Sequence, residues 1–159
     1  MPLTSLTLNG TKVKDLSPLQ GMPLRRLTAA ATLVTDLTPL QGVPLEDLDL
    51  QQSGVSDLAP LEGMPLASLK LDGCAKVESI APVRGVPFKY LSIPDTGVKD
   101  LSPLKGAGVE GLVFTPRNIT KGMEAIRGMK TLRNIGGASQ QAMPAVEFWR
   151  RYDAGEFNK

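Results

Sequence analysis

The side chains that could carry out catalysis are few in this chain, and their spacing fits no catalytic pattern. The 159 residues include no histidine, so the commonest general base and the commonest metal ligand are both missing. The single cysteine, Cys74, has no second cysteine for a disulfide or a metal site. Gly136 and Gly137 lie in no phosphate-binding motif, and the scattered Asp and Glu residues fit no calcium loop. We therefore expect no enzymatic activity, no cofactor and no metal site.

One acidic pattern is regular. Asp15, Asp36, Asp57 and Asp100 each lie two residues before a Ser, Thr or Ala that is followed by proline. A ladder of carboxylates could serve as acid and base groups. An Asp in this position can also accept hydrogen bonds from exposed backbone N–H groups of the turn that follows. We expect the second, structural role.

The elements that position these side chains follow from an internal repeat. The chain divides after Gly21, Gly42, Gly63, Gly85, Gly106 and Gly128 into six segments of 21 or 22 residues, and ten of the thirteen prolines fall in two further columns. Three apolar columns run through the segments: Leu6, Leu27, Leu48, Leu69, Leu91 and Leu112; Leu8, Ala29, Leu50, Leu71, Ile93 and Phe114; and Val13, Val34, Val55, Val77, Val98 and Ile119. Such a period predicts a solenoid.

Each repeat has a strand half and a turn half. The first half, L-x-x-L-x-L, alternates as a short strand with one buried face does, so we expect six strands stacked in parallel. The second half has a proline near its middle, which excludes a long helix. Ser17-Pro18, Thr38-Pro39 and Ser102-Pro103 are interpreted as a cap residue followed by proline at the first helical position. Only about one 3₁₀ turn then fits before the glycine.

The unit L-x-x-L-x-L-x-x-[TSC]-x-V-x-D-L-[STA]-P-L-x-G resembles the short leucine-rich repeats of internalin-type bacterial proteins over residues 1–128. The resemblance implies an α/β leucine-rich-repeat solenoid, with short parallel strands on one face and 3₁₀ or irregular turns on the other. The family's usual Asn at the bend is replaced by Thr11, Thr32, Ser53, Cys74 and Thr96, and Arg117 interrupts the column. Their hydroxyl or thiol groups can still bond to buried backbone groups.

The two ends of the solenoid differ. Residues 1–137 are predicted to form six repeats plus a half-repeat, and residues 138–159 a C-terminal cap helix and tail. A helix over 144–153 should lay Val146, Phe148 and Trp149 over the end of the core, although an aromatic docking peptide is the alternative. Residues 143–159 also resemble the closing segment of repeat regions in large bacterial multidomain proteins, some of them serine/threonine kinases. The chain opens directly with Met1-Pro2-Leu3, so we expect its first, uncapped coil to be covered by further repeats, a partner or end-to-end self-association.

The expected strand face carries charges of both signs. Its candidate partner-binding residues are Arg25, Arg26, Glu46, Asp47, Asp49, Lys70, Lys89 and Tyr90. Such a mixed stripe suits a protein or peptide and not a nucleic acid, which requires a continuous basic field. Alternatively, these charges only keep the sheet soluble and pair neighbouring coils. The sole basis for a nucleic-acid or anionic partner is a second basic cluster comprising Arg117, Lys121, Arg127, Lys130 and Arg133.

The sequence therefore predicts a protein- or peptide-binding repeat module that acts through its strand face. No apolar run approaches the roughly 18 residues of a membrane span, and the formal net charge of +2 indicates no nucleic-acid or membrane partner by itself. The alternative is a structural spacer or regulatory appendage of a larger multidomain protein.

Overall fold

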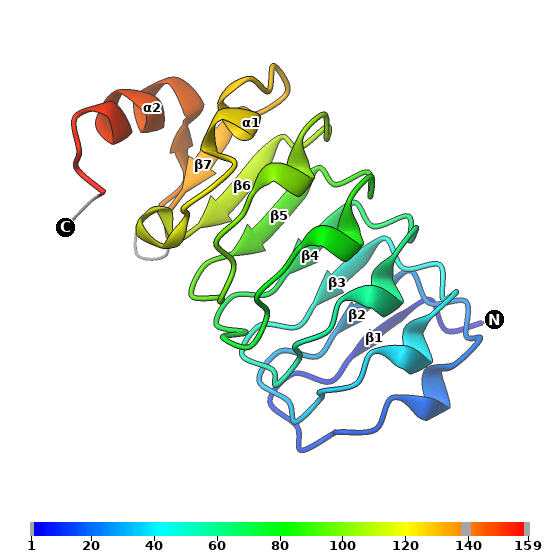
Figure 1. Ribbon diagram of the computed structural model, residues 1–159. Coiled ribbons are helices and arrows are strands. Elements are labelled where there is room, and N and C mark those ends of the chain that lie inside the picture. Colours follow the sequence, from blue (N-terminus) through cyan, green and yellow to red (C-terminus); the bar gives the residue numbers. More distant parts are fainter. Residues whose placement is uncertain (1, 138–140, 158–159) are drawn as a thin grey trace.

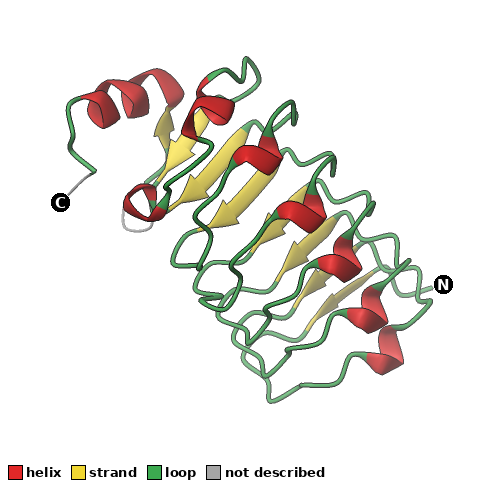
Figure 2. Cartoon of the chain, in the orientation of Figure 1, coloured by secondary structure: helices red, strands yellow, loops and turns green. Residues whose placement is uncertain are grey.

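Stacked coils form most of the molecule, and a C-terminal helix lies at one end of the stack (Figure 1). The computed structural model describes residues 2–137 and 141–157. Each of the first six coils contributes one strand to a single sheet, and Figure 2 shows most of the short helices in a row away from the strands. The strands are β1 (Ser5–Thr7), β2 (Arg26–Thr28), β3 (Asp47–Asp49), β4 (Ser68–Lys70), β5 (Tyr90–Ile93), β6 (Gly111–Phe114), β7 (Asn134–Gly136) and β8 (Met143–Pro144). The 3₁₀ helices are η1 (Ser17–Leu19), η2 (Thr38–Leu40), η3 (Ala59–Leu61), η4 (Ala81–Val83), η5 (Ser102–Leu104) and η6 (Pro116–Asn118), and the α-helices are α1 (Met123–Arg127) and α2 (Ala145–Asp153).

The sheet confirms the predicted fold class. Its strand order follows the sequence from β1 to β8, and every pair is parallel except β7 with β8. The register aligns the predicted leucine column from Leu6 through Leu112, and Ile135 of the half-repeat continues it. Leu27 and Leu69 are fully buried because a coil packs on each side of them, whereas Leu6 in the first coil is only half-buried. A coil therefore buries its apolar side chains against its neighbours and not within itself.

The short helices begin differently from the prediction. Ser17, Thr38 and Ser102 are the first residues of their 3₁₀ helices, and the residue before each helix makes no side-chain capping bond. The capping acceptor is the aspartate two residues earlier: the backbone N–H of Ser17 donates to Asp15 Oδ1 at 2.8 Å. The bonds from Thr38, Ala59 and Ser102 to Asp36, Asp57 and Asp100 repeat it at 2.7–2.8 Å. The serine-cap interpretation was thus wrong, and the structural role of the aspartate column is confirmed.

The polar column at the bend also performs its predicted role. The hydroxyls of Thr11, Thr32 and Thr96 each donate to a carbonyl three residues earlier, at 2.7–2.8 Å. The buried thiol of Cys74 donates instead to the carbonyl of Leu50 in the preceding coil, at 3.0 Å. Short polar side chains therefore satisfy the carbonyls at the bend, where the strand ladder ends.

The C-terminal helix α2 covers the last coils through a different stripe from the one predicted. Phe148 is fully buried and lies 5.8 Å from the ring of Phe114, between ring centroids. Trp149 is half-buried and packs edge-on against Phe148, whereas Val146 is 84% exposed. The prediction that Val146 covers the core was wrong, because Ala145, Phe148, Trp149 and Tyr152 share the inner face at helical spacing. The predicted boundary at residue 137 borders residues 138–140, which lie outside the described residues.

None of the helices in the described parts of the chain is long and apolar enough to cross a membrane.

We predict that Phe148 anchors the cap. Phe148→Ala should lower the free energy of unfolding by about 3–5 kcal/mol, because it removes a fully buried aromatic ring and leaves a cavity. Trp149→Ala should cost less, and Val146→Ala, the matched control on the exposed side of α2, should change stability by less than about 0.5 kcal/mol. Denaturant melts measure all three. Equal losses for Phe148→Ala and Val146→Ala would contradict this packing.

We also predict that the aspartate column makes stability depend on pH in the acid range. The hydroxyl and backbone N–H of the Ser or Thr two positions later lower the pKa of Asp15, Asp36 and Asp100 below the usual 3.8. A lowered folded pKa adds stability that is fully present above the unfolded pKa and is lost as pH falls through the folded value. Asp36→Asn keeps an acceptor oxygen but does not titrate, so its unfolding free energy should fall less steeply between neutral pH and pH 2. Glu62→Gln is the control, since the Glu62 carboxylate accepts no hydrogen bond from the described residues; an equal change in slope for both variants would refute this origin.

Candidate functional site

The strand face displays its side chains in rows that cross the coils. At the entry to each strand, two consecutive N–H groups donate to one carbonyl of the preceding coil: those of Arg25 and Arg26 donate to Thr4, at 2.8 and 3.1 Å. The same pair of bonds recurs at Glu46 and Asp47 and at Lys89 and Tyr90. This local irregularity interrupts strict alternation, so neither member of each pair is buried. For this reason two consecutive residues, such as Arg25 and Arg26, both lie on the strand face, as predicted.

Four of the eight predicted residues neutralise one another across β2 and β3. Arg25 forms an ion pair with Glu46, and Arg26 Nε lies 3.3 Å from Asp47 Oδ2. Each of these side chains remains at least 41% exposed. The pairs therefore link neighbouring coils at the surface, as the structural alternative predicts, while staying accessible to a partner.

The other four predicted residues have different surroundings. Asp49 accepts a hydrogen bond from the backbone N–H of Gln51 at 3.1 Å, within its own coil. Lys70 is its register neighbour on β4, and neither Lys70 nor Lys89 forms an ion pair with the described residues. Tyr90 is half-buried and its ring lies over Gly111, where a Cβ atom would come within 2.9 Å of Tyr90 Cδ2. The strand face thus offers charges of both signs that form no ion pair with the described residues, together with an aromatic ring.

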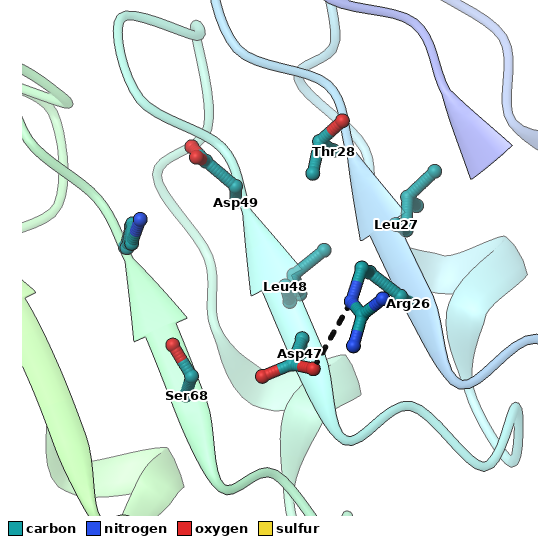
Figure 3. Close-up of a pocket in the computed structure, with 8 residues that line it drawn as sticks. Arg26, Leu27, Thr28, Asp47, Leu48, Asp49 and Ser68 are labelled. Carbon is teal, nitrogen blue, oxygen red and sulfur yellow. Dashed lines mark hydrogen bonds and ion pairs between the residues drawn. The ribbon is translucent and has the colours of Figure 1, made fainter. Parts of the chain in front are cut away.

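A shallow hollow of about 220 Å³ lies where β2, β3 and β4 meet (Figure 3). It is lined by Arg26, Leu27, Thr28, Asp47, Leu48, Asp49, Ser68 and Lys70. The Thr28 hydroxyl is shielded from solvent and has no hydrogen-bond partner among the described residues, although a buried polar group normally has one. Sequence reasoning missed this group, because a threonine in a strand carries no signal that its hydroxyl lacks a partner.

The size of the hollow limits what it can hold. Small-molecule sites usually enclose about 300–1,000 Å³, so this hollow suits one side chain of a larger partner. A larger hollow of about 380 Å³ is lined mainly by glycine, alanine, Met129 and Thr131, with Lys105, Glu124 and Lys130 at its polar positions. We favour the smaller one as the site, because it brings together four predicted residues and an unsatisfied hydroxyl.

The other side chains that the sequence singled out have the following surroundings among the described residues. They contain no group of three or more His, Cys, Asp or Glu side chains that could hold a metal ion. Cys74 is buried, with its thiol bonded to Leu50 and 3.5 Å from Ser53 Oγ. In the second basic cluster, Lys121 pairs with Asp100 and Arg127 pairs with Asp153. Two of its five cations are therefore already neutralised.

Two solved structures similar to this chain are internalins. An internalin (InlF) from Listeria monocytogenes superposes with a TM-score of 0.76 and 27% identity, over 84% of this chain and 41% of that protein. Internalin C2 from the same organism superposes with a TM-score of 0.68 and 21% identity, over 85% of this chain and 71% of that protein, and supports the fold alone. This chain therefore spans less than half the length of the first. No protein-family model and no curated protein sequence matches the chain.

We predict that the ion pairs on the strand face contribute little to folding. A double-mutant cycle with Arg26→Ala and Asp47→Ala should give a coupling energy below about 1 kcal/mol, since both side chains are exposed. The coupling should weaken further as salt is added. Denaturant melts of the four proteins measure it. A coupling of several kcal/mol that is insensitive to salt would mean that these charges primarily hold the coils together.

Proposed function

We propose that this internalin-type leucine-rich-repeat solenoid is a protein-interaction module that binds a protein or peptide segment through its strand face, without catalysis of its own. The observation that carries the proposal is the hollow between β2 and β4, which brings together four of the predicted residues with charges of both signs. A partner side chain that enters the hollow would lie among these charges.

The charges that would select the partner are those without a cross-strand ion pair. Asp49 and Lys70 are register partners on the adjacent strands β3 and β4, which are spaced about 4.8 Å apart, whereas Lys89 lies directly before β5, in the row of Arg25 and Glu46. A segment crossing the strands along this row would meet the negative Asp49 and then the positive Lys70, while the second positive group, Lys89, lies nearer the start of the strands. Such complementarity fixes the register of the partner and excludes segments of the wrong charge order.

Tyr90 would supply the apolar contact of this interface. Tyrosine is enriched among the residues that dominate binding energy, because it buries a large rigid surface and keeps a polar end. Its place over Gly111 leaves the ring only half-buried, so a partner could cover its remaining surface.

A structural spacer or regulatory appendage is the second candidate function, and the ion pairs between β2 and β3 favour it. In that case the strand-face charges only link the coils and keep the sheet soluble. The two candidate functions make different predictions: only in a binding module should a ligand lose affinity when the charges on the strand face are exchanged.

The test exchanges the charges of Asp49 and Lys70 without altering net charge. Peptides are selected on the immobilised chain from a random displayed library and then measured for affinity to the variant Asp49→Lys/Lys70→Glu. We expect a loss of at least about tenfold, equivalent to 1.4 kcal/mol. The matched control, Glu62→Lys/Lys105→Glu, makes the same exchange at exposed positions that follow η3 and η5 and should bind normally. Selection of no peptide above background, or equal affinity of both variants, would favour the spacer.

A further inference from the structure

The strand face changes character between its two halves. On β2, β3 and β4 the outward positions hold only charged or hydroxyl side chains, which are Arg26, Thr28, Asp47, Asp49, Ser68 and Lys70. On β5 and β6 the outward positions of the same two rows hold Tyr90, Ser92, Gly111 and Val113. The rows therefore run from the charged hollow to a region with one aromatic and one aliphatic side chain.

A glycine on the following strand lies beside each of these two apolar side chains. Tyr90 is the register partner of Gly111, where a Cβ atom would come within 2.9 Å of Tyr90 Cδ2 and 3.4 Å of Tyr90 Cε2. Val113 is the register partner of Gly136, where a Cβ atom would come within 3.3 Å of Val113 Cγ2 and of Ala142 Cα. Neither glycine has a positive φ, so neither is required by its backbone conformation. At Gly111 the missing side chain makes room for the Tyr90 ring alone.

The two apolar side chains keep part of their surface in solvent. Tyr90 and Val113 are half-buried, whereas Leu91 and Leu112, which point to the other side of the sheet, are buried in the core. Together Tyr90, Gly111 and Val113 form what we call the apolar patch. A tyrosine ring that leans along a sheet over a glycine presents a rigid surface on which a partner's apolar side chain can pack.

The charges directly before the apolar patch are of opposite sign. Lys89 precedes Tyr90 and Glu110 precedes Gly111, and neither forms an ion pair with the described residues. They favour neither an acidic nor a basic partner residue at this point. Apolar contact is therefore what the patch offers a partner, while the hollow offers charge.

The apolar patch lies at a fixed distance from the charged hollow. The hollow is centred on β3 and the patch spans β5 and β6, so their centres are between two and three strand spacings apart. At about 4.8 Å for each spacing, this distance is about 12 Å. An extended chain advances about 3.3 Å per residue, so about three or four residues of a segment that crosses the strands cover it.

We propose that the partner is an extended segment with an aromatic side chain three or four residues from a charged one. The charged side chain enters the hollow and the aromatic side chain packs on the apolar patch. Gly111 is a positioning residue in this arrangement, because it acts only through the Tyr90 ring. This inference rests on the proposed function and names the chemistry of the partner.

Peptides selected on the immobilised full chain from a random displayed library test the partner's pattern. We expect them to share an aromatic residue about three or four positions from a charged residue. Replacing that aromatic residue by alanine should lower affinity at least about tenfold. Selected peptides with no aromatic residue at this spacing, or with unchanged affinity after its replacement, would overturn the proposal.

Variants of the chain test the role of Gly111. Gly111→Ala should displace the Tyr90 ring and lower affinity at least about fivefold, as should Tyr90→Ala, whereas Tyr90→Phe keeps the ring and should bind normally. Gly108→Ala is the matched control in the same coil, because its Cβ atom would meet nothing within 4 Å. In a Tyr90→Ala background, Gly111→Ala should cause no further loss, since the ring through which it acts is gone. Additive losses would overturn the positioning role.

One comparison separates this inference from the proposed function. Peptides whose affinity falls for Asp49→Lys/Lys70→Glu but not for Tyr90→Ala would support strand-face binding and overturn the apolar patch. Selection of no peptide above background would overturn both. Denaturant melts check that each variant is folded, and the half-buried Tyr90 supplies the decisive variant if Gly111→Ala unfolds the coil.

Discussion

Every coil of this protein depends on its neighbours for burial of its leucines. A single 21-residue coil has a strand of three or four residues and one turn of 3₁₀ helix, which cannot enclose an apolar core alone. Parallel register places each leucine of the Leu6 column directly beside the next, so burial is shared between coils. The prolines and the aspartate column then fix each turn in a shape that returns the chain for the next strand. The leucine columns, the prolines and the aspartates are therefore parts of one packing arrangement that recurs in each coil.

The same constraint arranges the functional surface. Because register is fixed by the buried leucines, the side chains between them are carried into rows about 4.8 Å apart, and the charge order along the strand face follows directly from the sequence of the repeats. It also determines the ends: the last coil is closed by β8 and Phe148, while the first presents the apolar surface that all the others bury.

Most of the fold could be predicted from sequence, because the same residue types recur at the same positions of each 21–22-residue repeat. The leucine column, the aspartates and the bend hydroxyls were found this way, since a role that recurs in four or five coils is recognisable from residue type alone. Features that occur only once in the chain could not be found in this way. Val146 was placed on the core because it lies three residues before Trp149, yet rotation of α2 is set by Phe148 docking near Phe114. The pairing of Arg26 with Asp47 and the unpartnered Thr28 hydroxyl depend on side-chain geometry, which residue spacing does not specify.

The most direct test of coil-to-coil dependence is a comparison of two double-mutant cycles. Leu48→Ala with Leu69→Ala alters adjacent coils, and Leu48→Ala with Leu112→Ala alters coils separated by two others; sucrose, which strengthens burial, helps to keep the double variants folded. Shared burial predicts a coupling energy of at least about 0.5 kcal/mol for the adjacent pair and additivity for the distant pair. Equal coupling in the two cycles, or additivity in both, would contradict a core built from nearest-neighbour contacts.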